Sequence, residues 1–309
     1  MTHNKYGVLI IGGGPAGMSA ALVLGRSRIK TLILNTEKPR NLVTTHSHGF
    51  LTQDGKHPSD ILKTAKEQLS KYPSVTYSIE KATDLKQDDE WYRVVTEKDE
   101  YLAKRVIIAT GYKDNIEEVG IKGLASVYGK SVYPCPFCDG FELADKKLAV
   151  FGDAFMAPMF SKTISHWSND VIVFTNGENV ENEDLKRSLQ NNRVLLVEEE
   201  IKQLHSTNGI LQKVELASGK IIEREGGFIP DTKSTESTDF AKKLRISTEK
   251  GPFDMEVYKV DENKETDIKG LYIIGDARTG WSGVAVSVAE GSMVGAAITH
   301  QIIDEEWKE

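Results

Sequence analysis

The beginning of the chain contains a strand, a glycine-rich turn and a helix in direct succession. The apolar run Tyr6–Ile11, with its β-branched residues, predicts a first strand, and residues 30–34 predict a second. Between them stand Gly12-Gly13-Gly14-Pro15-Ala16-Gly17 and a segment of helical periodicity over residues 18–26. This order is typical of a dinucleotide-binding unit and predicts an α/β fold with a parallel sheet.

Three glycines of this turn have separate expected roles. Gly12 makes the tight turn, Gly14 lets the backbone approach a pyrophosphate, and Gly17 allows close helix packing. The phosphates would rest on the helix N-terminus. The alternative is a glycine-rich turn without a ligand, but the flanking elements and a second signature near the C-terminus favour a cofactor.

The second strand ends in Asn35, where dinucleotide-binding units usually carry an acidic side chain for the ribose hydroxyls. Asparagine still forms hydrogen bonds to a ribose, more weakly than a carboxylate. Asn35 is therefore a candidate cofactor residue, with Glu37 as a substitute.

The second signature is a buried-type strand over residues 271–274 that ends in Gly275-Asp276 and precedes a helix over about 285–303. Asp276 can accept a hydrogen bond from a ribityl hydroxyl, and the helix start can face a negatively charged flavin ring. A further strand, near residues 106–108, leads into a turn at Gly111. Gly111, Gly275 and Asp276 join the cofactor-binding candidates.

The chain has two cysteines, Cys135 and Cys138, with only two residues between them. Closing so short a loop stabilises a fold little, so the pair suits a redox switch better than a structural staple. Pro136 fits the first turn of a helix. Cys135 would then lie at the N-terminus of this helix, where the helix dipole lowers the pKa of a thiol. Asp139 follows directly and can shuttle a proton.

Half of a zinc site and two incidental buried thiols are the alternatives for this pair. Zinc takes four ligands, and no second Cys-His cluster completes a set unless two subunits share one. The sequence therefore predicts a redox pair and no metal site.

With these features the chain resembles, from about Tyr6 to Ile303, the low-molecular-weight thioredoxin reductase family of FAD-dependent disulphide oxidoreductases. The resemblance implies a homodimer in which Cys138 is the thiol against the flavin. It further implies that Cys135 attacks the substrate disulphide and that Asp139 is the acid/base.

The same resemblance implies an α/β architecture of two Rossmann-like three-layer dinucleotide-binding domains, the second inserted in the first. The FAD-binding domain would comprise residues 1–112 and 246–309. Residues 113–245 would form a pyridine-nucleotide-binding-like domain that carries the cysteine pair. FAD would be held by Gly12, Gly14, Gly17 and Asp276.

The likeness is closer to a branch with Pro-aromatic between the cysteines, which includes FAD-dependent dithiol oxidases. The stretches that carry it are residues 38–41 (Lys-Pro-Arg-Asn), 45–50 (Thr-His-Ser-His-Gly-Phe) and 167–177.

The inserted domain departs from the family at its own glycine turn. A strand over residues 148–151 is followed by Gly152-Asp153-Ala154, where the family carries a second glycine fingerprint for NADPH. Ala154 replaces the glycine that lets the backbone approach a pyrophosphate, and Asp153 adds a carboxylate. Residues 175–177 (Thr-Asn-Gly) stand where the family has a His-Arg-Arg run for the 2′-phosphate.

Lys186 and Arg187 lie further along and offer either a partial replacement or a solvated helix face. The sequence therefore predicts a degenerate NAD(P)H site, and makes a ferredoxin or flavodoxin an alternative electron donor.

The composition indicates a cytoplasmic enzyme. The net charge of −7, without a basic cluster, argues against nucleic acid. The apolar runs are of strand length, far short of a membrane span, and no secretory signal precedes the first strand. Few cysteines and a pair that must cycle suit a reducing cytosol.

The roles of three further side chains stay open. His46 and His48 would serve as a base or bind a metal, or would be loop histidines that bond backbone. Trp281 lies either over the substrate path or at a subunit interface.

Three functions follow. The first is a disulphide reductase, passing electrons from a donor through FAD and the Cys135–Cys138 pair to a thioredoxin-like protein or small disulphide. The second is a dithiol oxidase, in which electrons pass in the opposite direction, from a dithiol through the cysteine pair and FAD to oxygen or another acceptor. The third is a non-enzymatic flavin redox sensor.

Overall fold

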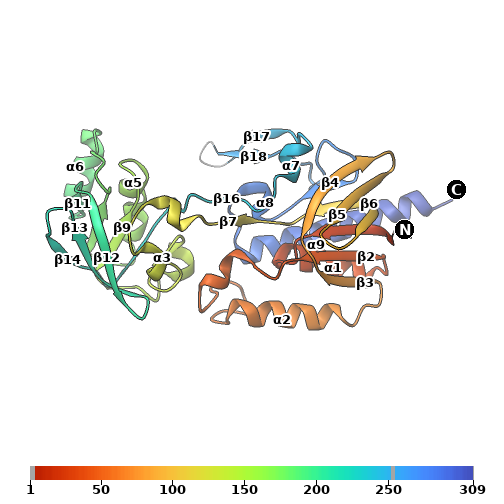
Figure 1. The fold of residues 1–309 in the computed structure, drawn as a ribbon, viewed down its shortest axis with the longest axis horizontal. Helices are drawn as coiled ribbons and strands as arrows, with labels where there is room; N and C mark the ends of the chain where they lie inside the picture. The colour runs from red at the N-terminus through yellow and green to blue at the C-terminus, as the bar shows by residue number, and fades with distance from the viewer. Residues whose placement is uncertain (1–3, 252–254, 309) are drawn as a thin grey trace. The chain divides into compact units, whose positions relative to one another are not determined.

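The computed structural model describes residues 4–251 and 255–308, which form two compact units. Unit 1 contains the described parts of residues 1–42, 58–113 and 235–309, and unit 2 contains residues 43–57 and 114–234. Their helices and strands are labelled in Figure 1. A short 3-10 helix, η1 (Arg40–Val43), spans the first boundary between the units.

Unit 1 is built on a sheet of the order β3-β2-β1-β6-β5-β4, with β19 also paired to β6. The start of β6 pairs with β5, and its end pairs in parallel with β19. Strands β5 and β19 therefore lie one after the other along β6. The elements of unit 1 are β1 (Asn4–Ile11), α1 (Pro15–Arg26), β2 (Thr31–Asn35), α2 (Pro58–Leu69), β3 (Val75–Ile79), β4 (Ala82–Asp88), β5 (Trp91–Thr96), β6 (Glu100–Ile108), β7 (Tyr112–Lys113), β16 (Thr235–Glu236), α7 (Phe240–Lys243), β17 (Thr248–Lys250), β18 (Glu256–Tyr258), β19 (Leu271–Ile273), α8 (Asp276–Thr279) and α9 (Gly283–Glu306).

Both faces of this sheet are buried, which explains the continuous apolar runs of its central strands. Val8 and Ile10 pack in a cluster with residues of α1, α2 and α9, whereas Leu9 and Ile11 pack in a second cluster with residues of β4 and β5. The alternation follows from the two-residue period of a strand. Unit 1 therefore has three layers.

Helices α1 and α9 approach each other closely in unit 1. A Cβ atom built on Gly291 would lie 2.1 Å from the carbonyl oxygen of Ala16 and 2.9 Å from the amide nitrogen of Ala20. Only a residue without a side chain fits at this contact.

Unit 2 repeats the design with the parallel order β11-β10-β9-β15-β8. Helices α5 and α6 pack on one face, and the antiparallel strands β12–β14 pack on the other. Its elements are η2 (Ile116–Val119), α3 (Leu124–Val127), β8 (Val132–Tyr133), α4 (Pro136–Asp139), β9 (Leu148–Phe151), α5 (Met156–Ile164), β10 (Val171–Phe174), α6 (Glu183–Asn191), β11 (Leu195–Val197), β12 (Ile201–Thr207), β13 (Ile210–Leu216), β14 (Ile221–Glu223) and β15 (Gly226–Phe228).

The predicted fold class is confirmed: the chain contains two Rossmann-like α/β domains, and the second is inserted in the first. The unit boundaries differ from those drawn on the sequence in two places. The chain returns to unit 1 at Thr235 rather than near residue 246, because Thr235 and Glu236 pair with Lys113 and Tyr112. Residues 43–57 lie in unit 2, although the sequence division places them in the first domain.

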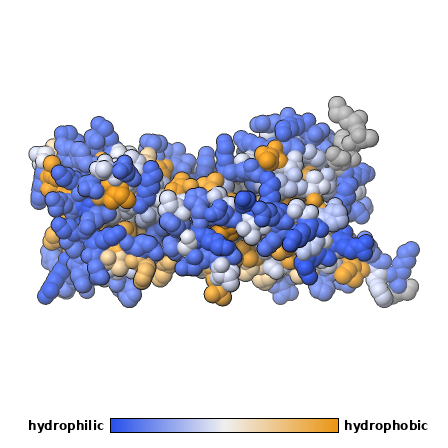
Figure 2. All heavy atoms as spheres, turned by 90° about the horizontal axis from the view of Figure 1, so that it is seen from below, coloured by the Kyte–Doolittle hydropathy of each residue, from blue (hydrophilic) through white to orange (hydrophobic). Residues whose placement is uncertain are grey.

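The exposed face in Figure 2 is mostly hydrophilic, and its apolar residues form small separate patches. No helix within the described residues has both the length and the apolar character needed to cross a membrane.

Candidate functional site

The first glycine turn packs tightly against the end of β6. A Cβ atom on Gly12, where φ is +113°, would lie 2.2 Å from the carbonyl oxygen of Ala109. A Cβ atom on Gly17 would lie 1.9 Å from the carbonyl oxygen of Gly12. These two glycines are therefore required by the turn itself.

Gly14 differs from its neighbours because the fold does not require it. Its backbone is extended (φ −77°, ψ −174°), and a Cβ atom there would meet no heavy atom within 4 Å. Gly14 is also the N-cap of α1, where no described side chain caps the helix. The first-turn N–H groups of α1 thus lie at an open, uncapped helix N-terminus, which fits a phosphate group.

Asn35 lies beside this turn, as predicted. A Cβ atom on Gly13 would lie 2.6 Å from Asn35 Cγ. The Asn35 amide donates to the hydroxyl of Tyr77 at 2.6 Å. The carboxylate of Glu37 instead accepts a hydrogen bond from Lys66 Nζ at 2.8 Å, which lowers the pKa of Glu37. Both side chains are thus paired within the protein, Glu37 with Lys66 and Asn35 with Tyr77, and it is Asn35 that lies against Gly13 of the turn.

Asp276 begins α8, directly after the loop that follows β19. Its Oδ1 accepts hydrogen bonds from the backbone N–H and the hydroxyl of Ser282, at 2.7 and 2.8 Å. Its Oδ2 lies 3.4 Å from Nη1 of Arg40, which also donates to the Gly280 carbonyl at 3.1 Å. The Arg40 guanidinium lies 5.2 Å from the centre of the Trp281 ring. Arg40 therefore fixes the loop that carries Asp276.

Gly275 and Gly111 lie at the same end of the sheet as Asp276. The Gly275 N–H donates to Oε2 of Glu290 at 2.7 Å, and Oε1 of Glu290 pairs with Lys264 Nζ at 3.1 Å. A Cβ atom on Gly111 would lie 4.0 Å from Asp276 Cβ. The structure brings these predicted residues together because β6 and β19 are parallel neighbours.

Sequence reasoning missed Arg40 and Glu290 as parts of this site. Arg40 is separated from Asp276 by 236 positions and Glu290 from Gly275 by 15. The only available signal was the presence of Arg40 within the branch-like stretch of residues 38–41.

The two cysteines lie at the start of α4 as free thiols. Cys135 is the N-cap residue and Pro136 follows at the first helical position, as predicted. A hydrogen bond from Cys138 lowers the pKa of the buried Cys135, assisted by the N–H groups of Cys138 and Phe137. The same hydrogen bond and burial raise the pKa of Cys138. Cys135 is therefore the sulfur that ionises first.

Asp139 ends α4 and is mostly buried. Burial raises the pKa of Asp139 to about 7, with the charge of Glu142 adding to the rise and that of His48 opposing it. A carboxyl group with this pKa can accept or donate a proton near neutral pH. Its properties match the acid/base role that the resemblance implies.

His46 and His48 lie on residues 43–57, which belong to unit 2 with the cysteines. His48 Nε2 lies 3.4 Å from Oε1 of Glu142, and Nδ1 lies 3.6 Å from Oδ1 of Asp54. Within the described part of the chain, the polar contact of the His46 ring is with the hydroxyl of its neighbour Thr45, at 3.0 Å. The two histidines are therefore not equivalent, and sequence reasoning missed Glu142 as the partner of His48.

The glycine turn after β9 is filled by carboxylates of the chain itself. Oδ1 of Asp153 accepts hydrogen bonds from the N–H groups of Phe155 and Met156, at 2.9 and 2.5 Å. Oε2 of Glu178 accepts one from the Ala154 N–H at 3.0 Å. The amides at the start of α5 are thus occupied, in contrast to the uncapped start of α1.

Residues 175–177 serve the fold of unit 2. The Asn176 side chain accepts a hydrogen bond from the Ile201 N–H at 3.0 Å, and the Thr175 hydroxyl donates to the Glu178 carbonyl. Lys186 and Arg187 lie on α6, each in an ion pair with an acidic residue of that helix, at 3.2 and 3.5 Å. These pairs favour the solvated helix face over a phosphate clamp.

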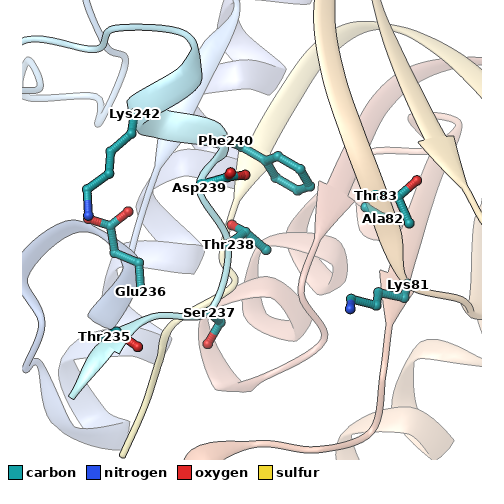
Figure 3. Close-up of a pocket in the computed structure, with 10 residues that line it drawn as sticks. All are labelled: Lys81, Ala82, Thr83, Thr235, Glu236, Ser237, Thr238, Asp239, Phe240 and Lys242. Atoms are coloured by element: carbon teal, nitrogen blue, oxygen red, sulfur yellow. The ribbon is translucent and has the colours of Figure 1, made fainter. Parts of the chain in front are cut away.

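A pocket of unit 1 borders the predicted site at Gly111, whose carbonyl oxygen accepts a hydrogen bond from the N–H of the lining residue Ser237 at 3.0 Å (Figure 3). The start of β4 lines one side of it, and β16 and α7 line the other, where Lys242 pairs with Glu236 at 3.1 Å. Its lining residues are Lys81, Ala82, Thr83, Thr235, Glu236, Ser237, Thr238, Asp239, Phe240 and Lys242.

Comparisons with known proteins agree with this geometry. The family model for pyridine nucleotide-disulphide oxidoreductases matches residues 6–291. The thioredoxin reductase AclD of Aspergillus oryzae is 29% identical, covering 99% of each chain. The thioredoxin reductase of Bacillus subtilis is 27% identical over 98% of this chain and 96% of its own. An oxidoreductase structure from Agrobacterium tumefaciens is 33% identical with a TM-score of 0.88, covering 98% of this chain and all of the other.

These matches extend over almost the whole chain and confirm the resemblance predicted from the sequence. The chain belongs to the pyridine nucleotide-disulphide oxidoreductase family.

Proposed function

We propose that the protein is an FAD-dependent thiol–disulphide oxidoreductase of the thioredoxin reductase type, whose sulfur chemistry takes place at Cys135 and Cys138. One observation carries the proposal. Cys135 has a lowered pKa and accepts a hydrogen bond from Cys138, beside a carboxyl group, Asp139, that titrates near pH 7. This is the combination that thiol–disulphide exchange requires.

Unit 1 would hold the cofactor. The uncapped start of α1 at Gly14 suits the pyrophosphate, Asn35 a ribose, and the loops at Gly111 and Gly275-Asp276 the ribityl chain and ring. When bound, FAD supplies the two-electron partner of the sulfur pair.

The sulfur pair would exchange with a thioredoxin-like protein or a small disulphide. The Cys135 thiolate attacks one substrate sulfur and forms a mixed disulphide, and the released substrate thiolate takes a proton. Cys138 then loses its proton and attacks Sγ of Cys135, which releases the second substrate thiol and leaves a Cys135–Cys138 disulphide. Asp139 is placed to hold a proton during these transfers.

The electron donor is proposed to be other than NAD(P)H. The carboxylates of Asp153 and Glu178 on the amides of Ala154, Phe155 and Met156 support a degenerate nucleotide site. A ferredoxin or flavodoxin would then supply the electrons. The same observation favours the second candidate, a dithiol oxidase, in which a dithiol substrate reduces the pair and oxygen accepts the electrons.

The test is anaerobic mixing of the flavin-loaded protein with NADPH, NADH, reduced ferredoxin or a dithiol while flavin absorbance is followed. Bleaching by ferredoxin supports the reductase, and bleaching by a dithiol, with oxygen uptake in air, supports the oxidase. Absence of bleaching by all four would contradict the proposal. Sedimentation of the same protein would test the homodimer that the resemblance implies.

Gly14→Val is expected to reduce flavin content without unfolding the protein. The Cβ atom of a valine at this position meets no heavy atom within 4 Å and β-branching suits the extended backbone, so the side chain is expected to obstruct a bound phosphate rather than the fold. We expect affinity for FAD to fall about tenfold or more, the effect of about 1.4 kcal/mol of lost binding. Flavin absorbance per protein and the melting temperature of the flavin-free form measure the two effects.

The contrasting variant is Gly17→Ala, whose Cβ atom would lie 1.9 Å from the Gly12 carbonyl oxygen. This variant should lose flavin and stability together. Full flavin occupancy in Gly14→Val would contradict the cofactor assignment.

A further inference from the structure

We propose that Glu290, held by Lys264, is a positioning residue of the cofactor site, which acts through the Gly275 N–H to fix the loop that presents Asp276 to the ribityl end of FAD. The inference rests on the proposed FAD-binding function of unit 1. It assigns a role to a buried ion pair that this function does not by itself require.

Gly275 has a backbone conformation that other residues do not readily adopt. Its φ is +65° and its ψ is −151°, a combination found almost only at glycine. A Cβ atom there would lie 3.1 Å from the Cβ atom of Ala16 and 3.3 Å from Oγ of Ser287, so the residue is confined between α1 and α9. Such a conformation persists only where the surrounding contacts enforce it.

One of the contacts that enforce it comes from Glu290. The Ile274 N–H donates to the Ile108 carbonyl of β6 at 3.1 Å. The next N–H, that of Gly275, donates instead to Oε2 of Glu290 at 2.7 Å, and this hydrogen bond is buried. A buried N–H group without a partner is costly. The Glu290 carboxylate therefore satisfies the backbone where the pairing with β6 gives way to the loop.

The same face of α9 also holds Asp276. Ser287 and Glu290 are three positions apart on this helix, which places both side chains on one face. Oγ of Ser287 lies 2.8 Å from Oγ of Ser282, and the N–H and hydroxyl of Ser282 both donate to Oδ1 of Asp276. One helix face therefore holds Gly275 directly and Asp276 through Ser282.

Lys264 fixes the second oxygen of Glu290. Its Nζ lies 3.1 Å from Oε1, and the side chains of Lys264 and Glu290 are 19% and 10% exposed. The Lys264 carbonyl accepts a hydrogen bond from the Ile273 N–H at 3.3 Å, which ties this residue to β19 as well. A buried ion pair contributes little net stability, because the desolvation of both charges offsets their attraction. We therefore expect the pair to matter for the geometry of the loop.

ADP and FAD distinguish this role from a general weakening of unit 1. ADP carries the pyrophosphate and the adenosine that the Gly14 turn would bind, but it lacks the ribityl chain and the flavin ring. Loss of the Glu290 contact should weaken FAD and leave ADP unchanged. Loosening of α1 against α9 should weaken both ligands.

The experiment measures the affinity of the full-length protein for both ligands. FAD affinity comes from the return of flavin fluorescence when the loaded protein is diluted. ADP affinity comes from the ADP concentration that halves FAD rebinding, corrected for the FAD affinity of each variant. Glu290→Ala removes the acceptor of the Gly275 N–H, so FAD affinity should fall about tenfold or more and ADP affinity should stay within about twofold. Glu290→Gln keeps an acceptor oxygen and should stay within about threefold of the parent for both ligands.

Lys264→Met should weaken FAD severalfold, because it leaves the Glu290 carboxylate buried without a counter-charge. Lys264→Met/Glu290→Gln should recover the affinity of Glu290→Gln, since an amide needs no counter-charge and still accepts from the Gly275 N–H. Glu305→Ala is the matched control. It removes another carboxylate of α9, the partner of the buried Arg105, and should lower the melting temperature without changing FAD affinity.

Equal losses of FAD and ADP affinity in Glu290→Ala, or no loss of FAD affinity, would overturn the inference. FAD binding by Glu290→Gln as weak as that by Glu290→Ala would also overturn it. If Glu290→Ala does not fold, Lys264→Met and its double variant decide, and absence of recovery in the double variant contradicts the positioning role. If the parent binds ADP but not FAD, the proposed function fails instead.

Discussion

Cys138→Ser is expected to accumulate a stable mixed disulphide between Cys135 and its substrate. The serine hydroxyl can still donate a hydrogen bond to the Cys135 sulfur, so the pKa of Cys135 stays low and the thiolate still attacks. Without a second sulfur the adduct cannot resolve. Turnover should fall by about 10³-fold or more, as for loss of a nucleophile in other enzymes. Mass spectrometry after incubation with a disulphide substrate measures the adduct.

Cys138→Ala is the matched control for the hydrogen bond. Alanine removes the donor as well as the resolving sulfur, so the pKa of Cys135 should rise and adduct formation near neutral pH should be slower than in Cys138→Ser. Both variants lose turnover, and only their adduct rates differ.

Cys135→Ser should also lose turnover by about 10³-fold or more, but without forming an adduct. Cys138 remains mostly buried, which holds its pKa up and keeps it as a thiol. An adduct found only on Cys138 in this variant would reverse the two roles.

NADPH is expected to reduce the flavin of this protein poorly and without strong preference over NADH. A charge-assisted contact contributes about 1.5–3 kcal/mol. The absence of two phosphate-binding arginines is therefore expected to weaken NADPH binding by roughly 10²–10⁴-fold. The carboxylates of Asp153 and Glu178 add repulsion and occupy the amides that a pyrophosphate would use. Stopped-flow reduction at micromolar NADPH measures the effect.

The variant Asp153→Gly/Glu178→Ala should improve reduction by NADH and NADPH to a similar extent. It frees the amides at the start of α5 and removes two negative charges, but supplies no group for the 2′-phosphate. Asp184→Ala is the control, because it removes one carboxylate of α6 that pairs with Arg187 and leaves the turn untouched. Reduction of the parent within milliseconds by micromolar NADPH would contradict the prediction.

The regular elements near the glycine turns could be predicted from the sequence alone. Leu148–Phe151 forms a strand with the predicted bounds, and α1 and α9 extend the predicted helices by a few residues. These segments combine a clear apolar period with glycine at their ends, so local signals decide their structure. The residues 43–57 gave no such signal, because their place in unit 2 depends on contacts with distant segments.

The candidate site also divides into residues that local motifs predict and residues that only distant contacts place. The glycines, Cys135, Cys138 and Asp139 stand in compact motifs, and each lies where its motif predicts. The groups that set their chemistry are distant in sequence. Asp153 was visible in the turn as a repulsive charge, but the contact of Glu178 with the Ala154 N–H was not. A contact between residues that are distant in sequence produces no periodic pattern in the sequence.

Unit 1 is completed by elements that are synthesised after unit 2, namely β19 and α9. Strand β19 joins β6, and α9 packs on α1 through Gly291, long after the earlier elements have been made. At about 5–20 residues per second, roughly 10–30 s separate the synthesis of β6 from that of β19. During this time the end of β6 and the face of α1 that α9 covers lack these native partners, while residues 114–234 of unit 2 are made. A ligand that needs both the Gly14 turn and the Asp276 loop can therefore bind only after residue 276 has been made.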